Sequence, residues 1–302
     1  RPPMFDNALL MLPDFGTILL GALLARRFAY QRGFWDGAER LVYYVLFPAL
    51  LFNSILSAKF SFATDSLLLA AAVATLLSAA ALGFLARPLF RTEAALFASC
   101  VQTSYRYNSY VGLALAQSLF GARGVALLAL ILAVCIPLAN LIAVTTLARH
   151  GKTHLGRELV TNPLILSTVS GMVAHVAGLE LPGFASSFLT RMGAASLALG
   201  LLCIGAGLAF RTVKDDPRSL SWFSFVKLIA MPTVGVIVAW ALGLRGLEAQ
   251  VVVLFAALPT ASSAYILAAR MGGLAAPVAV LITFQTLAAM VTLPLWLTFA
   301  RL

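Results

Sequence analysis

The sequence predicts an all-α membrane protein whose ten transmembrane helices form two inverted five-helix repeats. Hydrophobic residues make up 61% of the chain and charged residues 11%, whereas soluble domains contain about 25% charged residues. Ten apolar segments approach the roughly 20 residues that cross a hydrocarbon core of about 30 Å. The fourth and the ninth segments contain polar, helix-breaking residues, which predicts that their middles are unwound.

The ten segments are separated by short connectors, which leaves no room for a soluble domain. They span residues 7–27, 36–57, 66–86, 93–120, 124–147, 161–178, 188–210, 221–243, 248–271 and 276–299. The formal net charge of +10 comes from basic residues that recur in small groups between apolar segments. This distribution is typical of cytoplasmic loops beside anionic lipid. It does not form the basic face that would bind nucleic acid.

The orientation follows from the basic residues of alternate connectors. One side has Arg26, Arg27, Arg32, Arg40, Arg87, Arg91, Arg149, Lys152, Arg157, Arg211, Lys214, Arg218 and Arg270. The other side has Arg1, Lys59, Arg123, Arg191, Arg245 and Arg301. Because cytoplasmic loops are enriched in lysine and arginine, we expect the first side to be cytoplasmic. Both termini of this multi-pass protein of the cell (inner) membrane are then extracytoplasmic.

The longest polar connector divides the chain into two halves of five segments. We therefore expect a first repeat over 1–148, a cytoplasmic linker over 149–160 and a second repeat over 161–302. Because each half has an odd number of spans, the second half enters the membrane with the opposite polarity. Residues 155 positions apart match in the pairs Glu93 and Glu248, Asn108 and Ser263, and Tyr110 and Tyr265.

Two prolines also occupy comparable positions in the halves. Pro137 and Pro294 lie at similar depth in the fifth and tenth segments, where we expect them to break the helices. Three glycines of the seventh segment, Gly200, Gly205 and Gly207, favour close helix packing.

The fourth segment contains an arginine at membrane depth, in the stretch Tyr105-Arg-Tyr-Asn-Ser-Tyr110. The 28 residues of this segment would form a helix about 42 Å long, which exceeds the hydrocarbon core, so an unwound middle is expected. Arg106 lies about 20 Å along that path. A mid-membrane arginine costs at least about 2.5 kcal/mol. No acidic residue lies in the central part of any segment, so substrate contact is favoured over an ion pair or an extension to the interface.

The ninth segment contains Leu258-Pro-Thr-Ala-Ser-Ser-Ala-Tyr265. Pro259 removes a backbone donor and clashes with the preceding turn, and nearby hydroxyl groups can satisfy the freed backbone groups. Unwound middles expose helix amino termini, which favour anions, and a guanidinium matches a carboxylate. The predicted substrate-binding residues are Arg106, Asn108, Ser109, Gln102, Pro259, Thr260, Ser262, Ser263 and Asn53. The predicted substrate is a small organic anion.

Some polar residues of the segments also have a structural interpretation. Asn53 and Gln102 fit helix–helix hydrogen bonding as well as a substrate cavity. Lys227 lies near the cytoplasmic end of the eighth segment, and we expect its ammonium to extend to the membrane surface. Cys100, Cys135 and Cys203 lie in different apolar segments, which indicates buried thiols. The scattered histidines do not have metal-ligand spacing, so neither a metal nor another cofactor is predicted.

The two interrupted stretches, with Met271-Gly-Gly and the segment Leu181–Leu208, resemble bacterial members of the auxin efflux carrier family. The resemblance covers essentially the whole chain. It implies that the fourth and ninth helices cross at their unwound centres. It also implies that helices one, two, six and seven form a scaffold, often dimeric, and that the other six carry substrate in an elevator-like movement. The expected assembly is a homodimer in the lipid bilayer.

The resemblance implies a carboxylate substrate such as malonate or malate, or auxin in plant relatives. Plant members have a proline in the fourth-helix crossing where this chain has Tyr107-Asn-Ser109, which argues against auxin specificity. An exporter of an auxin-like aromatic carboxylate is the alternative. A passive channel or a ligand-sensing membrane protein is an alternative function. Motifs of intramembrane enzymes are missing from the sequence, which argues against catalysis. Uniport and coupling to a proton or sodium both stay open.

Overall fold

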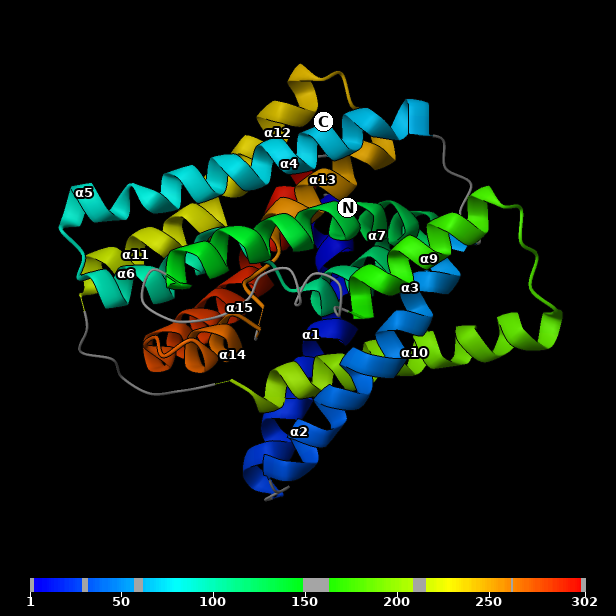
Figure 1. Ribbon diagram of the computed structural model, residues 1–302, viewed down its shortest axis with the longest axis horizontal. Helices are drawn as coiled ribbons and strands as arrows, with labels where there is room; N and C mark the ends of the chain where they lie inside the picture. Colours follow the sequence, from blue (N-terminus) through cyan, green and yellow to red (C-terminus); the bar gives the residue numbers. More distant parts are fainter. Residues whose placement is uncertain are drawn as a thin grey trace.

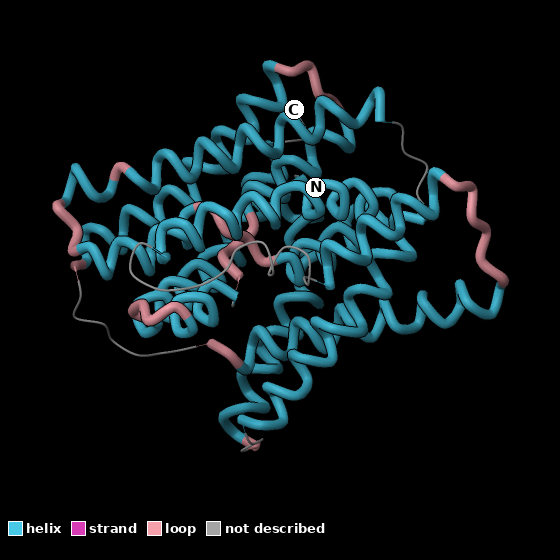
Figure 2. The backbone as a smooth tube through the Cα atoms, in the orientation of Figure 1, coloured by secondary structure: helices cyan, strands magenta, loops and turns pink. Residues whose placement is uncertain are grey.

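The computed structural model describes residues 3–28, 32–56, 62–148, 163–208, 216–261 and 263–299. Within these ranges every regular element is a helix and none is a strand (Figures 1 and 2). The chain is therefore an all-helical protein, as its sequence predicts. The expected linker 149–160 lies outside the described residues.

The helices of the first half follow the predicted segments closely. They are α1 Pro3–Arg27, α2 Arg32–Leu41, η1 Val42–Leu46, α3 Phe47–Leu56, α4 Phe62–Phe84, α5 Ala86–Phe90, α6 Ala94–Cys100, η2 Val101–Ser104 and α7 Ser109–Ala148. Gly121 has φ 64° and ψ −159° inside α7, a conformation that is readily open to glycine. This kink lies where the sequence predicts the connector between the fourth and fifth segments.

The helices of the second half also match the predicted segments. They are α9 Pro163–Val176, α10 Gly183–Ala206, α11 Pro217–Phe225, η3 Val226–Ala230, α12 Met231–Ala241, α13 Gly246–Ala257, α14 Ser263–Arg270 and α15 Ala275–Phe299. Asp216 caps α11 by accepting a hydrogen bond from the backbone N–H of Arg218, and Pro217 occupies the first helical position, where its missing N–H costs nothing.

Several described helices have the length and apolar composition to cross a bilayer. Five such stretches are Ser66–Phe90, Ala94–Leu147, Gly183–Ala206, Pro217–Ala241 and Ala275–Phe299. The helix Gly246–Ala257 is apolar but shorter. Since a spanning helix needs about 20 apolar residues, these stretches define a multi-pass membrane protein.

The prolines act differently from the prediction at two positions. Pro137 and Pro294 were expected to break their helices, but α7 and α15 continue through them. In a membrane helix, neighbouring groups can satisfy the backbone groups that a proline frees, so the helix can continue. Elsewhere a proline closely follows a π-helical turn: Pro48 follows η1 and Pro232 follows η3. Such a turn adjusts the hydrogen-bond pattern locally without ending the helix.

Both predicted interruptions are present. Residues 105–108 separate η2 from α7, and residues 258–261 follow the end of α13 before α14 begins at Ser263. The segments on either side of each break are helical, so the polar stretches interrupt the helix only locally. The chain therefore has two pairs of half-helices, α6–η2 with the first part of α7, and α13 with α14.

The helices pack in two groups. In the first group α1 packs along α10, α3 packs along α9, and α10 also contacts α3. In the second group α12 packs against α4 and α13, and α13 also contacts α7 and α15. Figure 1 shows α2, α3, α9 and α10 gathered on one side, and α4, α5, α11 and α12 on the other. α7, which begins directly after the first break, contacts both groups.

Glycines allow the close approach of α1 and α10. A Cβ at Gly205 would collide with the carbonyl oxygen of Ile18, and a Cβ at Gly21 would collide with that of Leu202. The packing role expected of Gly205 is therefore confirmed. At Gly200 a Cβ would find ordinary contacts with Phe47 and Tyr110, so that position is less tightly constrained.

Lys227 does not extend to the membrane surface. Its side chain is fully buried in η3, so the expectation of an interfacial ammonium is wrong. The helical stretch begins at Pro217 and not at the predicted residue 221. Lys227 therefore lies about 15 Å along the helix path, deeper than a position near the helix end.

Candidate substrate site

The two helix breaks contact each other directly. The backbone N–H of Asn108 donates to the carbonyl of Pro259 over 2.7 Å. The hydroxyl of Thr260 donates to the carbonyl of Thr103 over 2.7 Å, with a longer contact of 3.4 Å to that of Arg106. Thr260 is fully buried, so these bonds are shielded from water. The break of each helix thus satisfies backbone groups of the other, as an unwound segment in a membrane requires.

Asn108 caps the second half-helix of the fourth segment. Its side-chain oxygen accepts hydrogen bonds from the backbone N–H groups of Tyr110 and Val111, at 3.1 and 3.3 Å. An asparagine at this position satisfies amide groups that have no partner in the first helical turn. Asn108 therefore directs the amino terminus of α7 toward the break, and its oxygen is already engaged in that structural role.

Arg106 occupies the break between η2 and α7 and is only 9% exposed. Its guanidinium donates to the side-chain oxygen of Gln102 over 3.0 Å and to that of Asn140 over 2.6 Å. It also contacts the hydroxyl of Ser263 at 3.4 Å. These three partners are neutral, and they come from η2, α7 and α14. They fix the direction of the guanidinium.

Gln102 connects Arg106 to the ninth segment. Its amide nitrogen donates to the carbonyl of Ser99 over 3.0 Å and to that of Ala264 over 3.3 Å. Because Ala264 is the second residue of α14, the same side chain orients Arg106 and connects the fourth segment to the ninth. Gln102 is fully buried, so its amide acts within the protein interior.

Asn140 is a site residue that the sequence analysis missed. It lies on α7 beyond the kink at Gly121, in the predicted fifth segment, and makes the shortest of the three Arg106 contacts above. The signal was present in the sequence as a single amide in an apolar run. A lone amide in such a run is often explained by helix packing, so only the tertiary contact assigns it to the cluster.

The remaining predicted site residues lie in different places. Ser109 is the first residue of α7 and is half-buried. Asn53 donates to the hydroxyl of Thr190 over 3.3 Å, which joins α3 to α10 and fits the helix–helix alternative considered for it. Ser262 lies outside the described residues. The structure thus brings Arg106, Gln102 and Ser263 together, and it places Asn108, Pro259 and Thr260 in the backbone contacts.

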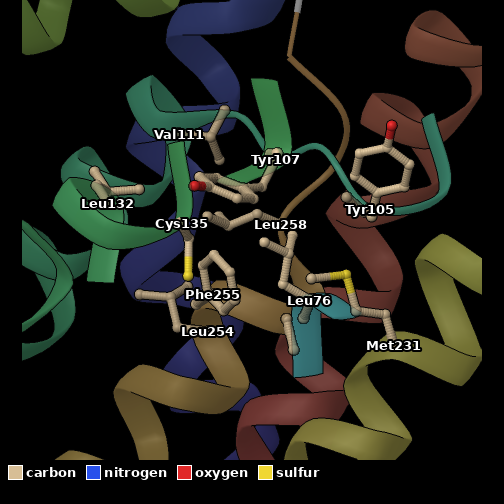
Figure 3. Close-up of a cluster of buried hydrophobic side chains, with 14 of the residues drawn as sticks. Leu76, Tyr105, Tyr107, Val111, Leu132, Cys135, Met231, Leu254, Phe255 and Leu258 are labelled. Atoms are coloured by element: carbon tan, nitrogen blue, oxygen red, sulfur yellow. The ribbon is translucent and has the colours of Figure 1, made fainter. Parts of the chain in front are cut away.

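Aromatic side chains close one side of the breaks. Tyr105 and Tyr107 are buried on either side of Arg106 in the chain. The ring of Tyr107 packs edge-on against Phe255 of α13, with centroids 4.6 Å apart. Figure 3 shows Tyr107 beside Cys135 and Leu258, while Tyr105 lies toward the other side of the cluster. This packing covers one side of the first break with apolar rings, and electrostatic interactions are stronger in such a low-dielectric surrounding.

The chemistry of the site favours an anion. A guanidinium provides a permanent positive charge and a planar set of donors that match a carboxylate. The amino termini of α7 and α14 follow the two breaks, and helix amino termini favour negative charge. None of the buried side chains in the described part of the chain is an aspartate or a glutamate.

Comparison with known proteins agrees with this architecture. Residues 147–297 match a family described as "Membrane transport protein". The "Putative malonate transporter" of Rhizobium meliloti is 26% identical over 278 residues, covering 87% of this chain and 86% of the relative. An "Uncharacterized transporter" of Methanothermobacter thermautotrophicus is 24% identical over 267 residues, covering 85% and 86%. The "Uncharacterized transporter YfdV" of Escherichia coli K12 is 24% identical over 305 residues, covering 97% of each chain.

The family match covers half of the chain and defines a class of multi-pass membrane transport proteins. The chain belongs to the membrane transport protein family, which includes the auxin efflux carriers. The resemblance inferred from the two interrupted stretches is therefore confirmed. The family and the names of the relatives indicate a transporter and not an enzyme.

Proposed function

We propose that this protein is a secondary transporter of small organic anions, namely carboxylates such as malonate or malate. One observation carries the proposal: a buried arginine lies at the contact of two helix breaks and is oriented by neutral side chains from three elements. The substrate carboxylate binds the guanidinium of Arg106 and exchanges its water for protein donors. The malonate named for the Rhizobium meliloti relative fits this chemistry.

The geometry of the breaks supports a substrate site of moderate affinity and high selectivity for charge. Hydrogen bonds to Gln102 and Asn140 fix the Arg106 guanidinium before substrate binds. Substrate binding therefore does not have to order a flexible arginine side chain. A carboxylate paired with a buried arginine contributes several kcal/mol relative to a site without the cation. Ser263 is exposed at the start of α14 and offers a hydroxyl to the same ligand.

The packing of the helices supports an elevator type of alternating access. The group α1, α3, α9 and α10 provides a scaffold, whose closest contacts are those between α1 and α10. The second group contains both breaks and the hydrogen bonds that join them. Because Asn108 and Thr260 tie the breaks together, the site moves with the second group as one body, and the scaffold stays fixed in the membrane.

The same packing supports the proposed inverted repeat. The contact of the first helix with the seventh, α1 with α10, corresponds to that of the sixth with the second, α9 with α3. The proposal includes repeats over 1–148 and 161–302, an inner-membrane location with both termini extracytoplasmic, and a homodimer joined through the scaffold.

Counterflow in proteoliposomes tests the proposed function. Vesicles that contain purified protein are preloaded with unlabelled malonate and diluted into labelled malonate, and uptake is followed with time. A carrier gives transient accumulation that saturates with substrate and requires the internal malonate. Malate, an aromatic monocarboxylate and a neutral amide of malonate serve as competitors.

Two results would contradict the proposal. A flux that rises linearly with malonate concentration and does not depend on the internal malonate would indicate a channel. Competition by the neutral amide as strong as that by malate would show that charge does not select the substrate. Preference for the aromatic monocarboxylate over both dicarboxylates would favour the auxin-like alternative.

A further inference from the structure

A second buried basic side chain lies in an element that packs against both interrupted segments. Lys227 is fully buried in η3, and its ammonium nitrogen lies 3.0 Å from the thioether sulfur of Met231, its hydrogen-bond partner among the described residues. A thioether is a weak acceptor, whereas an ammonium has three donors that require oxygen acceptors or water. Among the described residues this thioether gives the Lys227 amine one weak acceptor.

The position of Lys227 connects it to the substrate site. η3 packs against η2, which carries the Gln102 that orients Arg106, and against α13, which ends at the second break. Figure 3 shows the thioether of Met231 extending toward Leu76 and Leu258, below the break that contains Tyr107. Lys227 and Arg106 are thus both buried, and the element that carries Lys227 packs against the element that precedes Arg106.

The neighbouring elements offer Lys227 little charge compensation. α12 and α15 contain no titratable residue. α13 has Glu248, which pairs with Arg123 over 3.1 Å near the start of that helix. α11 has Arg218 in its first turn, and Tyr105 directly follows η2. The side chain of Asp65, at the start of α4, lies outside the described residues.

We propose that Lys227 binds the coupling proton and that the protein is a proton–anion symporter; this inference rests on the proposed function. An anion at Arg106 stabilises the protonated form of Lys227, because opposite charges in a low-dielectric region attract strongly. Linkage is reciprocal, so protonation of Lys227 strengthens anion binding equally. One proton then enters with the anion on one side of the membrane and leaves with it on the other.

Combined measurement of anion and proton movement tests this inference. Proteoliposomes containing a pH-sensitive dye receive labelled malonate at a pH where malonate is fully ionised. Wild type is expected to acidify the interior in proportion to malonate uptake. Lys227→Met keeps the length of the side chain but cannot bind a proton, so it should exchange malonate with a lower affinity and lose the acidification.

Two further variants separate coupling from folding. Lys227→Arg keeps a permanent charge and should also exchange malonate without moving protons, and it decides the question if the methionine variant fails to fold. Thr233→Val is the matched control on the same helical segment, because among the described residues its hydroxyl donates to the carbonyl of Ile229 in that segment. It should match wild type in both readouts.

The outcomes distinguish the two proposals. Malonate uptake by wild type without acidification, or acidification by Lys227→Met equal to that of wild type, would overturn the proton site and leave the carrier intact. Absence of carboxylate uptake by wild type would overturn both, since the label reports the carrier and the dye reports the proton.

Discussion

The backbone N–H of Asn108 donates to the carbonyl of Pro259 over 2.7 Å, and this bond joins two helix breaks from opposite halves of the chain. Pro259 has no backbone donor of its own, yet its carbonyl is used by the other break. The two interruptions are therefore one structural unit, in which each provides hydrogen-bond partners for backbone groups of the other. Four predictions follow from that unit and its surroundings.

Thr260→Val should weaken the junction of the breaks. The change removes the bond to the carbonyl of Thr103 and leaves a buried acceptor, which costs about 1–3 kcal/mol. We expect a lower thermal unfolding temperature in detergent and slower malonate counterflow. Thr298→Val is the control, because in the described part of the chain the hydroxyl of Thr298 donates to the carbonyl of Pro294 in the same helix. Equal unfolding temperatures for the two variants would contradict the role of Thr260.

Asn108→Asp and Asn108→Ala should have different effects. Aspartate is as good a helix cap as asparagine, whereas alanine costs about 1 kcal/mol. The aspartate variant keeps the cap, and its buried carboxylate can pair with Arg106, so it should be more stable than the alanine variant. However, the new carboxylate lies two residues from Arg106 and competes with an external anion, so it should weaken malonate binding more than alanine does. Stronger malonate binding by the aspartate variant would contradict the electrostatic role of the site.

Gly205→Ala should destabilise the scaffold group. A Cβ at this position collides with the carbonyl oxygen of Ile18, and overpacking of this kind costs about 1–3 kcal/mol. Gly16→Ala on α1 is the matched control, since a Cβ there meets nothing within 4 Å. Thermal unfolding of both variants in detergent provides the measurement. A Gly205 variant as stable as the Gly16 variant would show that α1 and α10 can separate freely.

The sequence was sufficient to locate the breaks. Arg106 and Pro259 are conspicuous in apolar segments, because a charge and a missing donor are both costly in a membrane. The helix bounds followed from apolar length, and the role of Gly205 followed from its small size. These features depend on local chemistry, which a single sequence displays.

The rest depended on tertiary contacts. Asn140 is 34 residues from Arg106, and nothing in the local sequence selects it over Asn53 as the partner. The side chain of Asn108 is used as a helix cap because the break ends at that residue, which apolar patterning cannot specify to one position. Lys227 was misplaced because its helix begins at Pro217, before the predicted start of the segment. Pro137 and Pro294 are accommodated without a break.

Binding of malonate to Arg106 variants tests the central claim most directly. Calorimetric titration of purified wild type, Arg106→Ala and Arg106→Lys compares their affinities, and Arg123→Ala is the control because Arg123 is an exposed arginine paired with Glu248. Loss of a buried charge partner costs about 2–5 kcal/mol, so the account predicts at least a roughly 30-fold weaker affinity for Arg106→Ala. It predicts partial retention for Arg106→Lys and no change for Arg123→Ala. A folded Arg106→Ala variant that binds malonate as tightly as wild type would contradict the account.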